Sequence, residues 1–535
     1  MNNGELADRL AAFAALLELS EANPYTARAY QRAAETIRGA PVPVEELVRS
    51  GRVRELRGIG PGIEARLRQL VETGQIPEVA ELERHLTPEL IGLGRYLGLS
   101  TRKSMDIARA LGIRTIDELR EVAATGRLSD VPGIGPKTEA QIVEALARES
   151  QARPRQGLML PPALTLVGTV AAALGGEVAG DVRRWRDSCE WLAVVCRASG
   201  PERLLEDFAT LPQIVAVIER DEWRAVGVTV EGVALELVVA PPEAFGTALL
   251  RATGAPAYVE ALEPLPDAPD EEAVYRTLGL PWCPPELREE VFSGEPPALL
   301  APSDIRGDLH CHTTWSDGRA SVEEMGAAAR ERGYDYVAIC DHTPAVGAVR
   351  GLSPDDVRRQ GEEIAAANEK LAPFRILRGI ECDILPDGRL DLPDDVLAEL
   401  DWVQASVHGG QRMPGREMTK RVVDALRNPY VRCLSHPTGR LIGRRPENAL
   451  DLDRTFAVAL EEGVAVEVNG LPARLDLSGQ HVREAIKAGV QIVCSTDAHS
   501  TGGLENMTLS VATARRGWAT AADVLNTRAL AEILR

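Results

Sequence analysis

Apolar and polar positions alternate regularly after residue 304, and this pattern predicts a domain of parallel strands and helices. Short apolar runs alternate there with longer helix-like stretches, which is typical of a βα architecture. The strand candidates are IRGDLHCH, YVAICDH, RILRGIE, DWVQASVH, VRCLSH, VAVEVN and QIVCSTDAH.

The preceding part of the chain has a different pattern and predicts further domains. Residues 1–150 read as short helices with frequent turns, and residues 151–161 form a linker. Residues 162–260 mix helices with apolar strands such as EWLAVVC and VTVEGVALELVVA, and residues 264–303 form a connector rich in Pro, Asp and Glu. At roughly 100–200 residues per domain, a chain of 535 residues is expected to hold three or four domains of mixed α+β and α/β type.

Composition narrows the class of protein. The net charge is −20, which argues weakly against a nucleic-acid partner, but residues 1–150 hold 20 Lys and Arg against 22 Asp and Glu. The chain contains no run of about 18 apolar residues and no signal-peptide pattern, so we expect no membrane association. Eight cysteines without a CxxC pair favour reduced thiols and a cytoplasmic location. Oligomeric state leaves no clear mark on the sequence, and a monomer is expected.

Histidines are scarce, and their placement points to a metal site. Six of the eight lie at or near the ends of the predicted strands after residue 304. In a barrel of parallel strands the C-terminal strand ends converge on one mouth, so these side chains are expected to meet. A single histidine at a strand end is more often a hydrogen-bonding residue, but six in one domain favour coordination. Imidazole with carboxylate suits Zn²⁺, Mn²⁺ or Fe²⁺ better than Mg²⁺, which stays an alternative.

The motifs HCHTTWSDG, CDHT, GIEC, SVHGG, SHPTGR and STDAHS resemble the PHP (polymerase and histidinol phosphatase) phosphoesterase domain over about residues 304–520. The resemblance implies a distorted seven-stranded βα barrel with three divalent ions. It assigns His310, His312, Glu381 and Asp497 to one ion, Glu381, His408 and His436 to a second, and Asp317, His342 and His499 to a third. Glu381, Asp497 and His499 are also the expected catalytic residues. Arg440, Arg515 and Arg516 are candidates for binding phosphate, although surface arginine is the usual reading.

Two glycine-rich turns near the N-terminus share one pattern. LRGIGPGIEARL (56–67) and LSDVPGIGPKTEAQIVEAL (128–146) both place Gly-Ile-Gly-Pro before a helix, which resembles the helix-hairpin-helix DNA-binding motif. The free N–H groups of the second helix can bind a phosphate without reading base sequence. A plain turn between helices is the alternative. The expected contact residues are Gly58, Gly60, Gly62, Gly133, Gly135, Lys137 and Thr138.

The order of parts resembles a bacterial family X DNA polymerase with a C-terminal PHP domain, and NPYTARAYQRAAETI, AGDVRR, PPEAFGTALL and VYRTLGLPWCPPELRE add to the likeness. The resemblance implies an N-terminal helical domain (1–85), a fingers-like helix-hairpin-helix domain (86–150), a nucleotidyltransferase-like palm (160–260), a thumb-like region with linker (261–300) and the PHP domain (304–535).

The palm departs from that family where nucleotidyl transfer needs three carboxylates. By spacing, Trp191 and Ala193 stand at the paired aspartate positions and Glu236 at the third. Trp and Ala cannot bind Mg²⁺, so polymerase activity is expected to be lost or weak. Residues 1–102 also contain no lysine, which argues against lyase chemistry through a Schiff base.

The sequence therefore predicts a DNA-repair protein whose PHP domain hydrolyses phosphodiesters as a 3′–5′ exonuclease, with AP endonuclease activity as a further candidate. Gapped, nicked or 3′-ended DNA is the expected partner. Three alternatives stay open: an active gap-filling polymerase using Asp187, Glu190 and Glu236, a small-molecule phosphatase of the histidinol-phosphate type, and a non-enzymatic scaffold that binds DNA ends.

Overall fold

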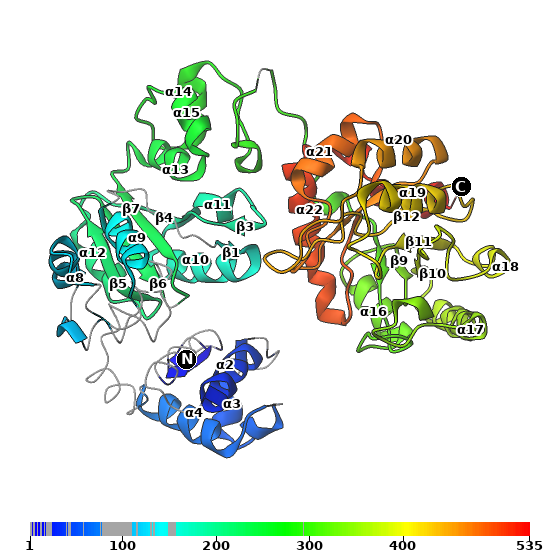
Figure 1. Ribbon diagram of the computed structural model, residues 1–535, viewed down its shortest axis with the longest axis horizontal. Helices are drawn as coiled ribbons and strands as arrows, with labels where there is room; N and C mark the ends of the chain where they lie inside the picture. The colour runs from blue at the N-terminus through cyan, green and yellow to red at the C-terminus, as the bar shows by residue number, and fades with distance from the viewer. Residues whose placement is uncertain are drawn as a thin grey trace.

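The computed structural model shows several domains in a row along the chain (Figure 1). It describes residues 24–38, 44–56, 58–74, 116–128, 134–147, 157–229, 231–292 and 294–534, with isolated further positions among the first 131 residues.

The C-terminal domain is a seven-stranded parallel sheet that curls into a nearly closed barrel. Its strands are β8 (Gly307–Cys311), β9 (Tyr336–Ile339), β10 (Arg375–Asp383), β11 (Trp402–Ser406), β12 (Cys433–Leu434), β13 (Ala465–Asn469) and β14 (Ile492–Ser495). They lie in chain order from β8 to β14, and a parallel bridge between Cys311 and Ala498 joins the two edges. The predicted βα barrel with seven strands is confirmed.

Helices cover the outside of this barrel (Figure 1). They are α16 (Val322–Glu331), α17 (Pro354–Leu371), α18 (Asp394–Leu397), α19 (Gly415–Leu426), α20 (Leu452–Glu462), α21 (Gly479–Lys487), α22 (Met507–Arg516) and α23 (Leu530–Ile533). Capping boxes begin two of them: Ser321 with Glu324 at α16, and Ser353 with Asp356 at α17. Their apolar faces pack on strands that are buried on both sides, as expected for a parallel sheet.

The middle domain is built on a mixed five-stranded sheet in the order β2-β4-β7-β6-β5. Its strands are β2 (Glu177–Ala179), β4 (Leu192–Arg197), β5 (Ile214–Arg220), β6 (Arg224–Thr229) and β7 (Ala234–Ala240), and β1 (Leu158–Met159) pairs separately with β3 (Ser188–Cys189). The apolar run 228–240 is not one strand: it holds the end of β6 and all of β7, which pair antiparallel. Gly232, at φ +76°, lies in the turn between them.

Six helices accompany this sheet. α10 (Leu160–Leu174), α11 (Gly180–Arg183), α12 (Glu202–Ala209) and α13 (Phe245–Thr253) pack on it, and α14 (Pro256–Leu262) and α15 (Glu271–Leu278) form a separate apolar cluster with the chain that follows them. α10 begins at a Leu-Pro-Pro sequence and ends at Gly175, whose φ is +65°.

The N-terminal part is helical. α2 (Pro24–Arg38), α3 (Val44–Arg49) and α4 (Pro61–Thr73) share one apolar core, and α8 (Ile116–Ala124) and α9 (Pro136–Ala147) share another. Ala216 of β5 joins the second core, so this helical pair packs against the sheet of the middle domain.

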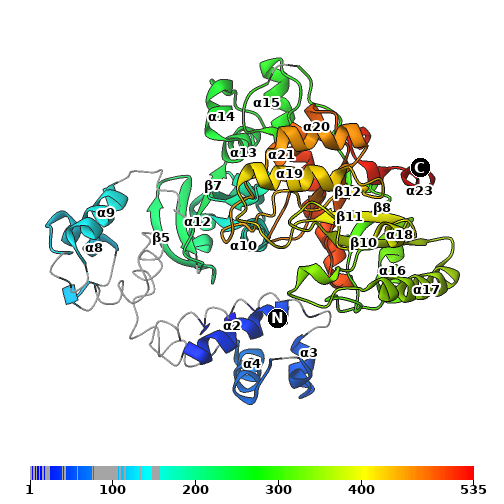
Figure 2. The same cartoon turned by 45° about the vertical axis from the view of Figure 1, so that its right-hand side comes forward.

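The middle domain lies beside the barrel (Figure 2), and the two meet along a seam of apolar and charged contacts. Leu475 and Leu509 of the barrel domain belong to the apolar cluster of the middle sheet. Ion pairs flank this contact: Arg440 lies 2.9 Å from Asp187, and Arg515 lies 2.7 Å from Glu286. The two domains therefore share a packed boundary.

Among the described residues, no helix has the length and apolar character needed to cross a membrane. All eight cysteines are buried free thiols.

Candidate metal centre

The histidine and carboxylate side chains singled out in the barrel converge at the C-terminal ends of its strands. His310 lies in β8 and His312 directly after it, while Glu381 lies near the end of β10. The others follow the strand ends by two to four residues, except Asp317, which lies in the loop after β8. Because parallel strands end at the same side of a barrel, residues as far apart in the sequence as His310 and His499 lie in one cluster.

A first group forms around the paired histidines of β8. The Nε2 atoms of His310 and His312 are 3.1 Å apart, and Asp497 Oδ1 lies 3.1 Å from His312 Nε2 and 3.7 Å from His310 Nε2. Glu381 Oε2 is 3.6 Å from His310 Nε2. These atoms surround one small volume of the size that a divalent ion fills.

Glu381 forms a second group, because imidazoles surround its carboxylate. Its Oε1 lies 2.8 Å from His436 Nε2 and 3.4 Å from His408 Nε2. Its Oε2 lies 2.9 Å from His342 Nδ1. Glu381 therefore touches both groups, the arrangement expected of a bridging ligand.

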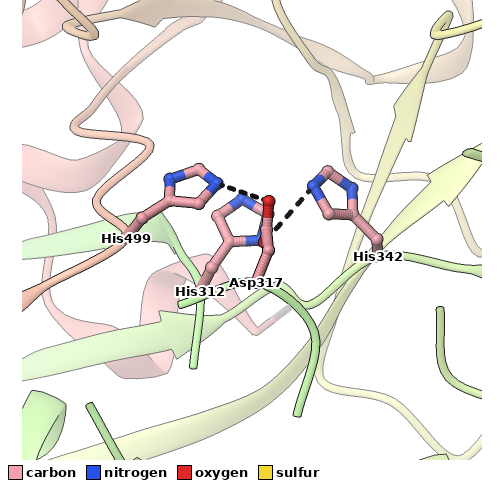
Figure 3. A group of neighbouring side chains, drawn as sticks. All are labelled: His312, Asp317, His342 and His499. Carbon is pink, nitrogen blue, oxygen red and sulfur yellow. Dashed lines mark ion pairs between the residues drawn. The ribbon is translucent and has the colours of Figure 1, made fainter. Parts of the chain in front are cut away.

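A third group gathers around Asp317 at the outer edge of the mouth. Figure 3 shows His499 and His342 on opposite sides of this carboxylate, with His312 behind it. His499 Nε2 is 3.3 Å from Asp317 Oδ2, and His342 Nε2 is 3.7 Å from Asp317 Oδ1. His312 adds its Nδ1 at 3.8 Å, so it lies between the first group and the third.

Several polar atoms of this cluster are buried without a hydrogen bond among the described residues. They are His312 Nδ1, His342 Nδ1, His436 Nδ1 and Glu381 Oε2. Buried polar atoms are nearly always satisfied. His312 Nδ1 lies near Asp317, and His342 Nδ1 lies near Glu381 Oε2, so unsatisfied atoms beside carboxylates of the cluster fit cation ligands. No cysteine contributes to these groups, which suits Mn²⁺, Zn²⁺ or Fe²⁺ bound by imidazole and carboxylate.

The charges within the cluster influence one another strongly. Burial disfavours the charged form of His408, but Glu381 and Asp383 outweigh it and raise its pKa to about 10. Burial opposes the charge of His499 too, yet Asp317 and Asp497 raise its pKa to about 9. Burial and the neighbouring His342 lower the pKa of His312 to about 3. Burial alone would raise the pKa of Glu381, but the imidazoles, His408 first, hold it well below its usual value.

Two further carboxylates orient the ligand histidines, and the sequence analysis did not identify them. His310 donates from Nδ1 to Glu467 Oε1 at 2.6 Å, and His408 donates from Nδ1 to Asp383 Oδ2 at 3.1 Å. A carboxylate on one ring nitrogen leaves the other free for a metal and makes it more basic. Their only signal in the sequence is a charged residue inside an apolar strand, as in VAVEVN.

The three arginines predicted as candidates for binding phosphate contact carboxylates at the boundary between the middle domain and the barrel. Arg440 pairs with Asp187, and Arg515 pairs with Glu286. Arg516 lies 3.7 Å from both Asp187 and Glu289. The charges of all three guanidinium groups are therefore balanced by carboxylates of the middle domain and the connector.

The palm positions lie on neighbouring strands of the middle sheet. Ala193 of β4 is opposite Glu236 of β7, and it is fully buried beneath α13. Trp191 Nε1 donates to Glu236 Oε2 at 2.9 Å, and Arg224 forms an ion pair with Glu236 Oε1. Both oxygens of this carboxylate therefore have protein partners. Among the described residues, none of the three positions belongs to a group of potential metal ligands.

The first glycine turn has the hairpin geometry. Gly58 has a φ of +90°, a conformation that favours glycine, and Gly60 precedes the first turn of α4. Gly62 lies within that turn, where its carbonyl accepts from Tyr30 at 3.3 Å. In the second turn Gly135 precedes α9, which contains Thr138. Gly133 and the side chain of Lys137 lie outside the described residues.

Comparison with known families matches the three parts of this architecture. Residues 308–469 match the PHP domain, residues 1–76 a helix-hairpin-helix domain, and residues 98–148 a SAM-like helix-hairpin-helix tandem. Probable phosphatases of Acetivibrio thermocellus and Caldicellulosiruptor bescii are 32% and 30% identical to this chain over 201 and 203 residues, which are 36% of this chain and 78% and 79% of theirs. The barrel and its cluster thus define an enzyme of the PHP class of metal-dependent phosphoesterases.

Similarity extends beyond the barrel. The DNA polymerase/3′-5′ exonuclease PolX of Bacillus subtilis is 32% identical over 568 residues, which cover 100% of this chain and 99% of that protein. The chain belongs to the family X DNA polymerases that carry a C-terminal PHP domain.

Proposed function

We propose that this protein binds DNA ends or gaps and shortens the strand from its 3′ end with the PHP domain, while its palm has lost most or all polymerase activity. In the hydrolysis, water adds to phosphorus and the P–O3′ bond breaks. The products are a 5′-nucleotide and a new 3′-hydroxyl. Activity at abasic sites, a monomeric state and a cytoplasmic location complete the proposal.

The observation that carries the proposal is the convergence of nine potential ligands on one mouth, several of whose nitrogen and oxygen atoms are buried without a hydrogen bond among the described residues. We assign three divalent ions to the three groups around His310, Glu381 and Asp317. Ions bound there lower the pKa of a water molecule and neutralise the phosphate.

The chain's own residues position and balance this chemistry. Glu467 and Asp383 fix the rings of His310 and His408, so that the Nε2 atom of each faces the mouth. Glu381 and Asp497 contribute negative charge, which holds cations in the buried interior. His499 donates from Nδ1 to the Asp497 carbonyl at 2.8 Å and is about one third exposed, so it lies where substrate enters.

The loss of polymerase activity is supported by the partners of Glu236. A carboxylate that accepts from Trp191 and pairs with Arg224 has no need of a cation. Asp187, one of the substitute ligands of an active polymerase, pairs instead with Arg440 across the seam. Glu190, another of them, belongs to no described group of metal ligands.

Binding to DNA is supported by the two glycine hairpins and by the family. The hairpin at Gly58 leaves space for a neighbouring chain, since an added Cβ would meet nothing within 4 Å. The relative in Bacillus subtilis is named for action on DNA. We therefore assign the sugar-phosphate backbone of gapped, nicked or 3′-ended DNA as the ligand of both hairpins.

The test uses gapped DNA labelled at the 3′ or 5′ end of the primer strand, with Mn²⁺, with and without dNTPs. We expect shortening that is independent of dNTPs and absent from His310→Ala/His312→Ala. Robust lengthening by that nuclease-dead variant would instead show a working palm.

A second candidate is a small-molecule phosphatase, which the similarity to the probable phosphatases favours. Histidinol phosphate and the labelled DNA are compared as substrates for the same preparation. Faster turnover of histidinol phosphate, with DNA left intact, would establish this second function and leave the hairpins unexplained.

A further inference from the structure

The loop after β13 carries a largely buried arginine that lies beside the metal centre. The side chain of Arg474 is 15% exposed, and its Nε lies 3.8 Å from Asp497 Oδ2. That carboxylate already accepts from His312 at Oδ1 (3.1 Å) and from Asn469 at Oδ2 (3.0 Å). Arg474 therefore stands beside a metal-ligand candidate without a hydrogen bond to it.

Two nitrogens of this guanidinium have no acceptor. Nε and Nη1 of Arg474 are both buried, and neither makes a hydrogen bond to any described residue. A buried donor left without a partner destabilises the folded protein, and a charged donor does so more strongly. Such an arrangement is expected where the missing partner is a ligand.

The loop that carries Arg474 is held from both sides. Arg440 donates from Nε to the carbonyl of Arg474 at 2.9 Å and also donates to the carbonyl of Leu475. The backbone N–H of Ile442 donates to the carbonyl of Ala473 at 2.8 Å, and Leu475 is buried in the core of the middle domain. The guanidinium is therefore preorganised, since the backbone beneath it has little freedom to move.

The charges around the mouth single out Arg474 as the guanidinium group with free donors. A phosphate group is negatively charged, and a guanidinium group with free donors adds directed hydrogen bonds to the attraction of any bound ions. The arginines at the nearby seam are paired with carboxylates of the middle domain or connector. Arg474 has two nitrogen donors without an acceptor among the described residues, and it lies next to Asp497.

We propose that Arg474 binds a non-bridging oxygen of the phosphate group that is hydrolysed. Buried guanidinium donors form short, strong hydrogen bonds to phosphate, and their planar geometry is not reproduced by lysine. The inference rests on the proposed phosphoesterase function, and it holds for a phosphodiester and a phosphomonoester alike.

The test measures binding of inorganic phosphate to the full-length, Mn²⁺-loaded protein by calorimetry. We expect Arg474→Gln to weaken phosphate binding about 10–100-fold, which corresponds to the loss of one or two charge-assisted hydrogen bonds. Arg474→Lys keeps the charge and should fall between the wild type and the glutamine variant. The matched control is Arg444→Gln, because Arg444 is exposed and lies two residues from Ile442, which contacts the Arg474 loop through the Ala473 carbonyl.

Elemental analysis of the same samples separates binding of phosphate from binding of metal. The proposal requires that Mn²⁺ content stays at the wild-type level in Arg474→Gln while phosphate affinity falls. If phosphate affinity is unchanged, or falls only in proportion to lost Mn²⁺, Arg474 serves as a counter-charge for Asp497 and the proposal is wrong.

Failure of the nuclease assignment gives a different result. Wild-type protein that binds phosphate through Arg474 but leaves labelled DNA intact would overturn the DNA substrate and support Arg474. Cleaved DNA with a KM and kcat unaffected by Arg474→Gln would overturn the role of Arg474 and support the nuclease.

Discussion

Glu236 in the palm and Glu381 in the barrel are both carboxylates that the family resemblance places at metal positions, and their surroundings are opposite. Glu236 accepts from the Trp191 indole and pairs with Arg224, so its charge is balanced by fixed donors of the protein. Glu381 is surrounded by imidazoles, and its Oε2 makes no hydrogen bond among the described residues. A carboxylate with protein donors on both oxygens stabilises the fold. Glu381 accepts from the Ser435 hydroxyl at Oε1, but its other contacts are with rings that can lose a proton, so it remains able to hold a cation.

Replacing Glu381 tests the barrel side of this comparison and should have the largest effect. Glu381→Gln removes the carboxylate shared between two groups, and we expect DNA hydrolysis to fall about 10³-fold, or about 4 kcal/mol in barrier height. Bound Mn²⁺ should fall with it, as measured by elemental analysis. Glu369→Gln, on the exposed face of α17, is the control. Near-normal cleavage by the Glu381 variant would remove the metal centre from the mechanism.

Ala193→Asp tests the palm side. Ala193 is fully buried beneath α13, so a carboxylate there lacks a partner and lies opposite Glu236. We expect the free energy of unfolding to fall by about 3 kcal/mol, as seen for an uncompensated buried charge. Urea denaturation measures this loss, and hydrolysis by folded protein should be unaffected. A stable variant that extends a primer with Mg²⁺ would contradict our account of the palm.

Glu467→Gln tests how much the carboxylates that orient the ligand histidines contribute to Mn²⁺ affinity. Gln keeps a similar shape but cannot balance a positive ring, so the ring of His310 loses its preferred orientation. We expect Mn²⁺ affinity to fall about 10–100-fold. A metal titration of activity should show the midpoint moving to higher Mn²⁺ while the plateau recovers. A plateau that stays low at saturating Mn²⁺ would assign Glu467 a part in the reaction itself.

The smallest effect concerns pH. Since Glu381 and Asp383, against the opposing effect of burial, raise the pKa of His408 to about 10, this ring carries a proton at pH 7 without metal. The same holds for His499, whose pKa is raised to about 9. Ions must displace these protons, so Mn²⁺ affinity should weaken as pH falls, by up to about tenfold per unit for each proton released.

Calorimetry in buffers of different ionisation enthalpy counts the protons that Mn²⁺ binding releases. No release between pH 7 and 8 would mean that the rings are already neutral in the metal-free protein. Around Glu236 no release of protons is expected, because neither of its two donors, the indole and the guanidinium, loses a proton between pH 7 and 8.

The sequence predicted the barrel and its mouth well, because the information is local. Each strand is a short apolar run, and residues such as His408 and His436 follow directly after one. The geometry of parallel strands then brings these side chains together without knowledge of any tertiary contact.

Contacts between distant elements could not be predicted in this way. Glu467 has only the weak signal of a charge inside an apolar strand, and Arg474 has no local signal, because their importance comes from contacts with His310 and Asp497, which are distant in the sequence. Arg440 was a candidate for phosphate from its place in SHPTGR, and only docking of the middle domain reveals Asp187 as its partner. The run 228–240 is mostly apolar, with Glu231, Gly232 and Glu236 within it, and its division into β6 and β7 depends on pairing within the sheet.

The ion pair of Asp187 with Arg440 joins the two halves of the comparison through a single side chain. Arg440 holds Asp187 on one side and the carbonyls of residues 474 and 475 on the other. A substitution at Asp187 is therefore expected to shift residues 474 and 475 beside the metal centre, whether or not the middle domain catalyses nucleotidyl transfer. Among related sequences, residues 187 and 440 are expected to change together, and such covariation would record a selective pressure that keeps the middle domain docked on the barrel.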